Sequence, residues 1–74
     1  MYILTKNKGF IINTDRADAI GLDPFDNKKI VAYFSEAKSE LASYETEERA
    51  KEVFEELISY IRENTKYYEM PEWW

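Results

Sequence analysis

Residues 46–64 read TEERAKEVFEELISYIREN, and this stretch decides the fold class. Its apolar side chains recur at three- and four-residue intervals, which places them on one stripe of an α-helix. The stripe consists of Ala50, Val53, Phe54, Leu57, Ile58 and Ile61. Thr46 can cap the first turn, and Asn64 can end the helix in a left-handed conformation. We therefore predict one amphipathic helix.

Short β-branched and aromatic runs precede this helix, and they are separated by turn-forming residues. The runs comprise residues 1–5, 10–12, 18–22, 29–34 and 39–44. Gly9 favours a turn with positive φ after the first run, and residues 23–27, DPFDN, predict a loop. Strands followed by a helix favour an antiparallel sheet with the helix across one face. The sequence thus predicts an α+β fold, a small antiparallel β-meander of four to five strands packed against one amphipathic α-helix.

The C-terminal stretch, residues 67–74, is unusually rich in aromatic side chains and reads YYEMPEWW. Pro71 forbids continued helix and favours an extended conformation at Met70. We expect a single domain over residues 1–66, followed by a final strand or extended arm over residues 67–74.

Aromatic side chains are enriched in the cores of protein interfaces because they bury large apolar areas. The arm therefore supplies the candidate residues of an oligomer interface, which are Tyr67, Tyr68, Met70, Trp73 and Trp74. Two alternatives stay open. The aromatic rings can fold back on their own sheet, or the terminus can fray.

The chain has few means of stabilising itself. It has 74 residues, and a domain of this size buries only about 60% of the surface that its unfolded chain exposes. Disulfides and the common zinc sites are excluded because the sequence contains neither cysteine nor histidine. Self-association is the remaining compensation, so we expect a homodimer or a higher oligomer.

Charge and hydropathy exclude several classes of partner. Residues 35–74 carry eleven acidic and five basic side chains, whereas residues 1–34 carry four acidic and five basic side chains. This acidic balance makes direct nucleic-acid binding improbable, because phosphate binding requires a basic surface. The sequence shows no membrane span and no signal-peptide pattern, and we expect a cytoplasmic protein.

Catalytic chemistry finds little support in the sequence. The usual nucleophile–base pairs need cysteine or histidine, and most of the fifteen Asp and Glu residues fall on the predicted solvent face of the helix. Asp23, Asp26 and Asn27 offer oxygen ligands in one loop, but their spacing does not match a calcium-binding loop. We therefore predict no enzymatic activity, no catalytic residue, no metal site and no cofactor.

Two weaker binding sites can be drawn from the sequence. Arg16, Lys28, Lys29 and Tyr33 combine basic and aromatic groups, which suit the phosphate and base of a nucleotide-like ligand. The acidic helix face can imitate the phosphates of nucleic acid, although charge on a helix is usually a solvated face.

Three segments resemble a diffuse group of short proteins from phages and prophages of low-GC Gram-positive bacteria. The segments are MYILTKNKG at the start, ASYETEERAKEVFEELI before and within the helix, and YYEMPEWW at the end. The shared pattern is M-Y-I-x-T, then Y-x-T/S-E-E-x-A, then Y-x-M-P. The resemblance implies a phage accessory protein, and some proteins of similar build look like counter-defence factors.

Composition and resemblance together predict a non-enzymatic protein that acts by binding a host protein or its own copies, and the resemblance implies a role in counter-defence. One alternative is a small-ligand binder that sequesters a nucleotide signal. Another is an acidic nucleic-acid mimic that inhibits a host enzyme.

Overall fold

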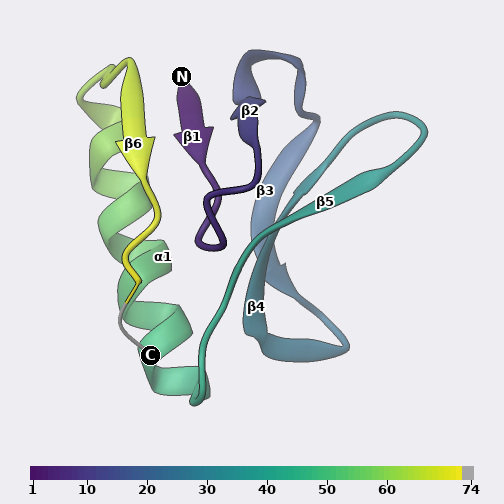
Figure 1. Cartoon of the computed structure of the whole chain (residues 1–74), viewed down its shortest axis with the longest axis vertical. Coiled ribbons are helices and arrows are strands. Elements are labelled where there is room, and N and C mark those ends of the chain that lie inside the picture. The colour runs from purple at the N-terminus through teal and green to yellow at the C-terminus, as the bar shows by residue number, and fades with distance from the viewer. Residues whose placement is uncertain (73–74) are drawn as a thin grey trace.

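The computed structural model describes residues 1–72 and contains one α-helix, one short 3₁₀ helix and six β-strands (Figure 1). In chain order the elements are β1 (Tyr2–Leu4), β2 (Ile11–Asn13), η1 (Thr14–Arg16), β3 (Ala19–Asp23), β4 (Asp26–Tyr33), β5 (Lys38–Ser43), α1 (Glu47–Arg62) and β6 (Tyr67–Glu69). The α+β class predicted from the sequence is confirmed.

The strands form two small sheets rather than one continuous meander. One sheet is an antiparallel meander in the order β3-β4-β5, and the other has the order β2-β1-β6. In the second sheet β2 pairs antiparallel to β1, whereas β6 pairs parallel to β1. A parallel pair requires a long crossover, and here the crossover contains α1.

Residues 67–72 are joined to the domain by strand pairing and by burial. β6 aligns Tyr67, Tyr68 and Glu69 with the three residues of β1. The backbone N–H of Tyr2 donates to the carbonyl of Lys66 at 2.8 Å, and the N–H of Met70 donates to the carbonyl of Leu4 at 3.0 Å. The predicted final strand is confirmed, and it completes the sheet of the domain itself.

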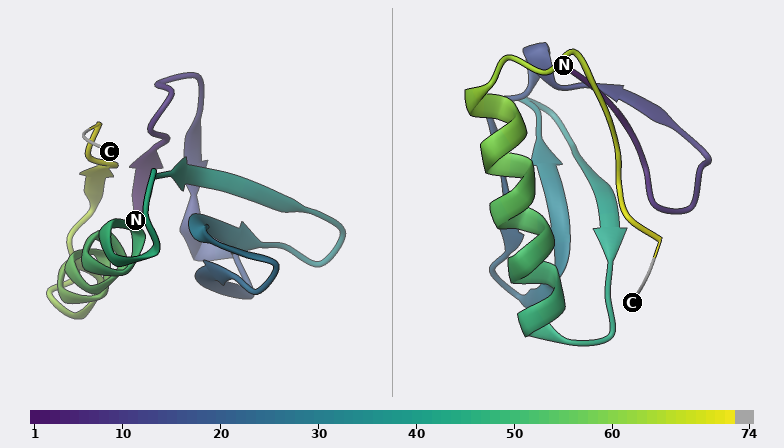
Figure 2. Two further views of the ribbon diagram at one scale, coloured as in Figure 1. Left: turned by 90° about the horizontal axis from the view of Figure 1, so that it is seen from below. Right: turned by 90° about the vertical axis from the view of Figure 1, so that its left-hand side faces the viewer.

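The hydrophobic core lies between α1 and the two sheets (Figure 2). Fully buried side chains from four elements meet there: Ile3, Ile30, Leu41 and Leu57 each have an exposed fraction of 1% or less. Of the predicted helical stripe, Ala50, Val53 and Leu57 are buried, and Phe54 is partly buried against the core.

Local side-chain hydrogen bonds define the ends of the helix and the turns. Thr46 caps α1 by accepting from the N–H of Arg49, and Asn64 has a φ of 58°, as predicted. The positive φ after β1 belongs to Lys8 (61°) and not to Gly9. The Asn7 side chain explains this turn, since its Oδ1 accepts from the N–H of Gly9 at 2.8 Å.

The predicted loop over residues 23–27 is shorter than expected. β3 runs to Asp23 and β4 begins at Asp26, so only Pro24 and Phe25 form the turn. The N–H of Phe25 donates to Oδ1 of Asp23 at 2.8 Å, and this hydrogen bond stabilises the two-residue turn.

Within the described residues, no helix is long and apolar enough to cross a membrane.

Candidate interaction surface

Six side chains form the outer face of the β2-β1-β6 sheet. Successive residues of a strand point to opposite faces, and residues directly paired across strands share a face. Ile3 of β1 is fully buried, so its neighbours Tyr2 and Leu4 point outward. The pairing then places their partners on the same side, and the outer face comprises Tyr2, Leu4, Ile11, Asn13, Tyr67 and Glu69.

This outer face is apolar and accessible. Tyr2 is 50% exposed, Ile11 61% and Tyr67 47%, and Leu4 between them is partly buried. Glu69 is the only charged residue of the six, and Asn13 the only amide. Tyr2 and Tyr67 occupy paired positions on neighbouring strands, so two aromatic side chains lie next to each other on this face.

The opposite face of the same sheet explains why the outer face is left open. Ile3 and Tyr68 point inward and belong to the hydrophobic core. α1 lies on that inner side, and no other described element covers the outer side (Figure 2). A small domain with a single helix therefore covers only one side of this sheet.

The structure separates the predicted interface residues of the arm. Tyr68 and Met70 have exposed fractions of 8% and 3%, and both lie in the core of their own chain. The hydroxyl of Tyr68 donates to Oε1 of Glu56 at 2.6 Å, and its ring lies 5.0 Å from that of Tyr60. Tyr67 alone is on the accessible face, while Trp73 and Trp74 lie outside the described residues.

Sequence reasoning predicted one member of the outer face, Tyr67, as an interface residue. It missed the other five, which are Tyr2, Leu4, Ile11, Asn13 and Glu69. The alternation of a strand places Tyr2 and Leu4 on one face and Ile3 on the other. The three side chains alone do not show which of these faces is buried. Which side is buried depends on pairing with residues more than sixty positions away. No local signal contains that information.

An exposed ion pair involves the turn that joins β1 to β2. Nζ of Lys8 lies 2.8 Å from Oε1 of Glu72, and both side chains are more than half exposed. The hydrogen bond to Glu72, aided by the negative charge of that carboxylate, raises the pKa of Lys8. This contact ties the residues after β6 to the turn after β1.

The predicted ligand set is divided between the two ends of β4. Lys28 and Lys29 lie at its start, and Tyr33 at its end, about 13 Å from Lys29 at the usual rise per residue. Arg16 belongs to η1, two residues before Asp18, whose N–H donates to the carbonyl of Tyr33 at 2.7 Å. The structure thus brings Arg16 toward Tyr33 and leaves the two lysines apart from them.

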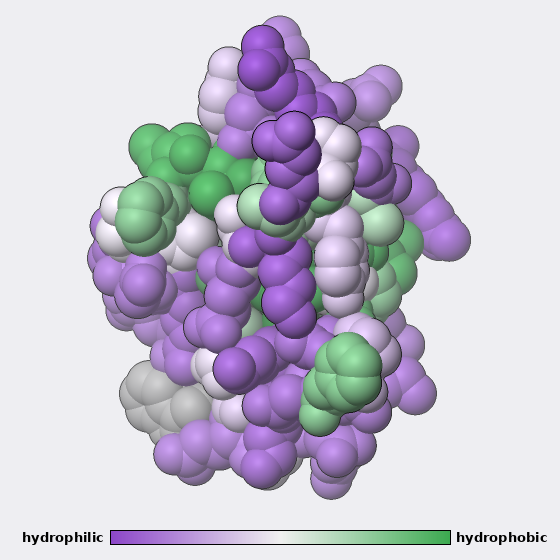
Figure 3. Space-filling view, turned by 90° about the vertical axis from the view of Figure 1, so that its right-hand side faces the viewer, coloured by the Kyte–Doolittle hydropathy of each residue, from purple (hydrophilic) through white to green (hydrophobic). Residues whose placement is uncertain are grey.

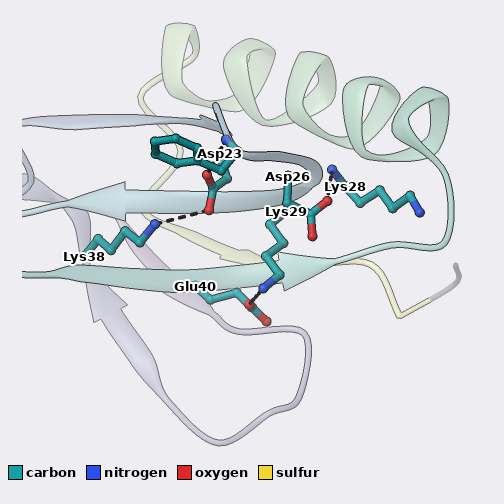
Figure 4. Close-up of polar contacts among 7 residues, drawn as sticks. Asp23, Asp26, Lys28, Lys29, Lys38 and Glu40 are labelled. Carbon is teal, nitrogen blue, oxygen red and sulfur yellow. Dashed lines mark hydrogen bonds and ion pairs between the residues drawn. The ribbon is translucent and has the colours of Figure 1, made fainter.

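Carboxylates near the start of β4 are engaged with the chain's own groups (Figure 4). Oδ2 of Asp23 lies 3.2 Å from Nζ of Lys38, across β4, and Lys29 lies 3.6 Å from Glu40. The N–H of Phe25 and the ammonium of Lys38 lower the pKa of Asp23, although burial opposes this shift. Both carboxylate oxygens of Asp23 are therefore engaged in contacts that stabilise the turn.

The described residues contain no group of three or more acidic side chains placed to hold a metal ion. A cavity of about 650 Å³ lies where α1 ends, and its lining includes Tyr2, Ile61, Asp15 and Lys66. Backbone carbonyls point from the end of a helix, and Asp15 adds a negative charge. Lys66 and the N-terminal ammonium of Met1, which lies 2.7 Å from Oδ1 of Asp15, add positive charge, so the lining carries charges of both signs.

The surface on the β3-β4-β5 side of the molecule is mostly polar. Figure 3 shows the side of the molecule at the right of Figure 1, where hydrophilic side chains dominate and hydrophobic atoms form separate patches. Phe25, which is 93% exposed, is an isolated aromatic residue at the turn between β3 and β4. Single exposed apolar residues of this kind are common and do not mark an interface.

Comparison of the chain with protein-family models, with curated proteins and with solved structures finds no match. The resemblance of its two ends and of its helix to short phage proteins therefore stays a prediction.

Proposed function

We propose that this chain is a non-enzymatic protein that acts by protein–protein binding, and that it binds copies of itself through the outer face. The observation that carries the proposal is the pair Tyr2 and Tyr67, about half exposed on adjacent strands beside the exposed Ile11. Tyrosine is enriched in interface cores because its large ring loses little conformational freedom on burial.

A second copy suits this face better than an unrelated polar surface does. A two-fold axis would place the same apolar patch on both sides, as in most homodimers. The hydroxyl groups of the tyrosines, together with Asn13 and Glu69, supply polar groups for hydrogen bonds at the rim. One carboxylate per copy is a small electrostatic cost for such a contact.

The size of the face sets the expected strength of association. Aromatic side chains bury about 150–250 Å² each, so the exposed parts of Tyr2, Tyr67 and Ile11 provide roughly 300 Å² per copy. A stable interface buries about 800 Å² per partner. We therefore expect reversible, concentration-dependent association unless further residues extend the contact.

Size-exclusion chromatography with light scattering tests the proposal. The unmodified chain is expected to increase in mean mass with concentration, and a Tyr2→Thr/Tyr67→Thr double variant to remain monomeric. Phe25→Thr is the matched control, because it removes an exposed aromatic ring outside the outer face. A monomeric unmodified chain, or an equal loss of mass in the control, would contradict self-association through this face.

The biological setting is proposed from the resemblance alone. We infer a phage accessory protein of the bacterial cytoplasm that acts as a counter-defence factor. Expression of the chain in bacteria that carry a defence system should restore phage plating, and the double variant should not. If the unmodified chain and the double variant restore plating equally, the counter-defence activity does not depend on the outer face.

The two other functions predicted from the sequence are less well supported by the geometry. Sequestration of a nucleotide signal predicts a ligand-dependent rise in melting temperature, and a panel of nucleotides tests it directly. Nucleic-acid mimicry needs free carboxylates on α1, yet Glu56 accepts from Tyr68 and Glu52 lies 3.7 Å from Arg49.

A further inference from the structure

Among the strands of residues 1–72, none pairs with the outer edge of β5 between Lys38 and Glu40. At the turn between β4 and β5, Phe34 and Ala37 exchange both backbone hydrogen bonds, at 2.7 and 3.3 Å. Bonded and non-bonded pairs alternate along an antiparallel ladder. The register therefore directs the N–H and C=O of Ser39 toward β4, and those of Lys38 and Glu40 away from it.

The same edge is closed one residue further along. The N–H of Lys6 donates to the carbonyl of Leu41 at 2.8 Å, and Nζ of Lys6 donates to the carbonyl of Ser43 at 2.7 Å. β5 passes close to the turn after β1 at this point and diverges from β2 toward its own start (Figure 1). Within residues 1–72, no backbone hydrogen bond reaches the outward N–H and C=O groups of Lys38 and Glu40.

A cavity of about 290 Å³ lies beside this open edge. It is lined by Thr5, Asn7, Phe10, Ile12, Ser39 and Glu40. Ile12 pairs with the buried Ile3 and points inward, and Phe10, two residues earlier, shares that face. Phe10 is nevertheless 67% exposed, so the cavity has an accessible apolar wall.

We propose that this edge and cavity bind an extended peptide segment of a partner protein, which pairs with β5 and inserts one apolar side chain against Phe10. Main-chain groups two residues apart, at Lys38 and Glu40, match the spacing of a strand. Strand addition gains affinity from such bonds and specificity from a pocket for alternate side chains. The volume suits one large aliphatic or aromatic side chain.

The charges at this edge are balanced and select no charged partner segment. Glu40 is the only charged residue in the lining of the cavity and pairs with Lys29, while Lys38 of the open edge pairs with Asp23. Recognition therefore depends on main-chain pairing and on the apolar anchor. The site is distinct from the outer face, so either can fail without the other.

Nuclear magnetic resonance of the full chain with synthetic peptides tests the proposal. The probe is a blocked peptide of about seven residues that alternates threonine and lysine around one central anchor. Leucine, phenylalanine and tyrosine serve as anchors, and alanine as the control. We expect the amide signals of Lys38 and Glu40 to shift, and their hydrogen exchange to slow, with the large anchors only.

Backbone N-methylation of the same peptide separates strand pairing from contact by side chains. Methylation of the nitrogens that face β5 should abolish binding, whereas methylation of the alternate nitrogens should leave it unchanged. Phe10→Ser should weaken binding about tenfold, a factor equivalent to 1.4 kcal/mol, and Phe25→Ser should not. The comparison of the two methylated peptides uses the unmodified protein, so this test remains valid even if Phe10→Ser does not fold.

Three results would overturn the proposal. Lys38 and Glu40 would show no shift with any anchor, or both methylated peptides would bind equally well. Alternatively, the shifts would be confined to Tyr2 and Tyr67, which would place the peptide on the outer face instead.

Discussion

Two buried tyrosines illustrate how single residues connect the C-terminal segment to the rest of the domain. The hydroxyl of Tyr44 donates to the carbonyl of Pro71 at 2.8 Å, and that of Tyr68 donates to Glu56. Burial raises the pKa of Tyr44 to about 12. Burial, followed by the hydrogen bond to Glu56, raises the pKa of Tyr68 still further above its ordinary value.

These pKa shifts predict a loss of stability in alkali. Because the folded-state pKa lies above the unfolded value of 10.0, the buried tyrosine stays protonated to a higher pH in the folded protein than in the unfolded chain. The stabilisation is complete below pH 10 and is lost as the pH rises toward 12. Absorbance of the phenolate should show late ionisation that Tyr44→Phe and Tyr68→Phe each reduce. Ionisation of both tyrosines near pH 10 would contradict their burial.

Asp23 predicts the opposite dependence at acid pH. Its pKa is lowered from 3.8, so its contribution to stability is present above that pH and is lost as the pH falls through the folded-state value. Urea unfolding should therefore show the largest deficit of Asp23→Asn above about pH 4 and a shrinking deficit below it. Asp26→Asn is the control, because Asp26 accepts only from the exposed N–H of Lys28 among the described bonds. A deficit that is independent of pH would reject the contribution of this carboxylate.

At the scale of elements, α1 shows what sequence periodicity predicts well and where it stops. The helix, its Thr46 cap and the left-handed Asn64 follow from local rules and are confirmed. Periodicity gives the direction of the apolar stripe, but not the depth to which each residue is buried. Leu57 is fully buried, whereas Ile61, one turn further on, is 44% exposed.

This difference predicts unequal costs for equivalent substitutions on the stripe. Leu57→Ala should lower the free energy of unfolding by about 2–5 kcal/mol, because it leaves a cavity in the core. Ile61→Ala should lower it by less than about 1 kcal/mol, because the side chain remains in contact with water. Denaturant unfolding monitored by circular dichroism measures both. Similar losses for the two variants would mean that the end of α1 is packed more deeply than the structure shows.

The strands show the limit of local prediction more clearly. Hydrophobic runs located all five strands that precede α1 to within a few residues. The second sheet depends on the parallel pairing of β1 with β6. This pairing joins segments more than sixty residues apart, so a meander was the simpler but incomplete expectation.

At the scale of the whole molecule, one helix and two three-stranded sheets have a radius of gyration of only 11.2 Å. α1 covers the inner side of the sheets, and the outer face keeps its aromatic residues in solvent. The sequence predicted self-association from the lack of disulfide and zinc chemistry, and it placed Tyr67 among the interface candidates. It could not assign Tyr2, Leu4 and Ile11, because their orientation follows from the register with β6.

The dependence of amide chemical shifts on protein concentration tests the central claim most directly. If copies of the chain bind one another through the outer face, the signals of Tyr2, Leu4, Ile11, Tyr67 and Glu69 will move together as the concentration rises. Signals of Phe25 and of the exposed side of α1 will stay constant. A spectrum that does not change with concentration, or changes centred on other residues, would contradict the account.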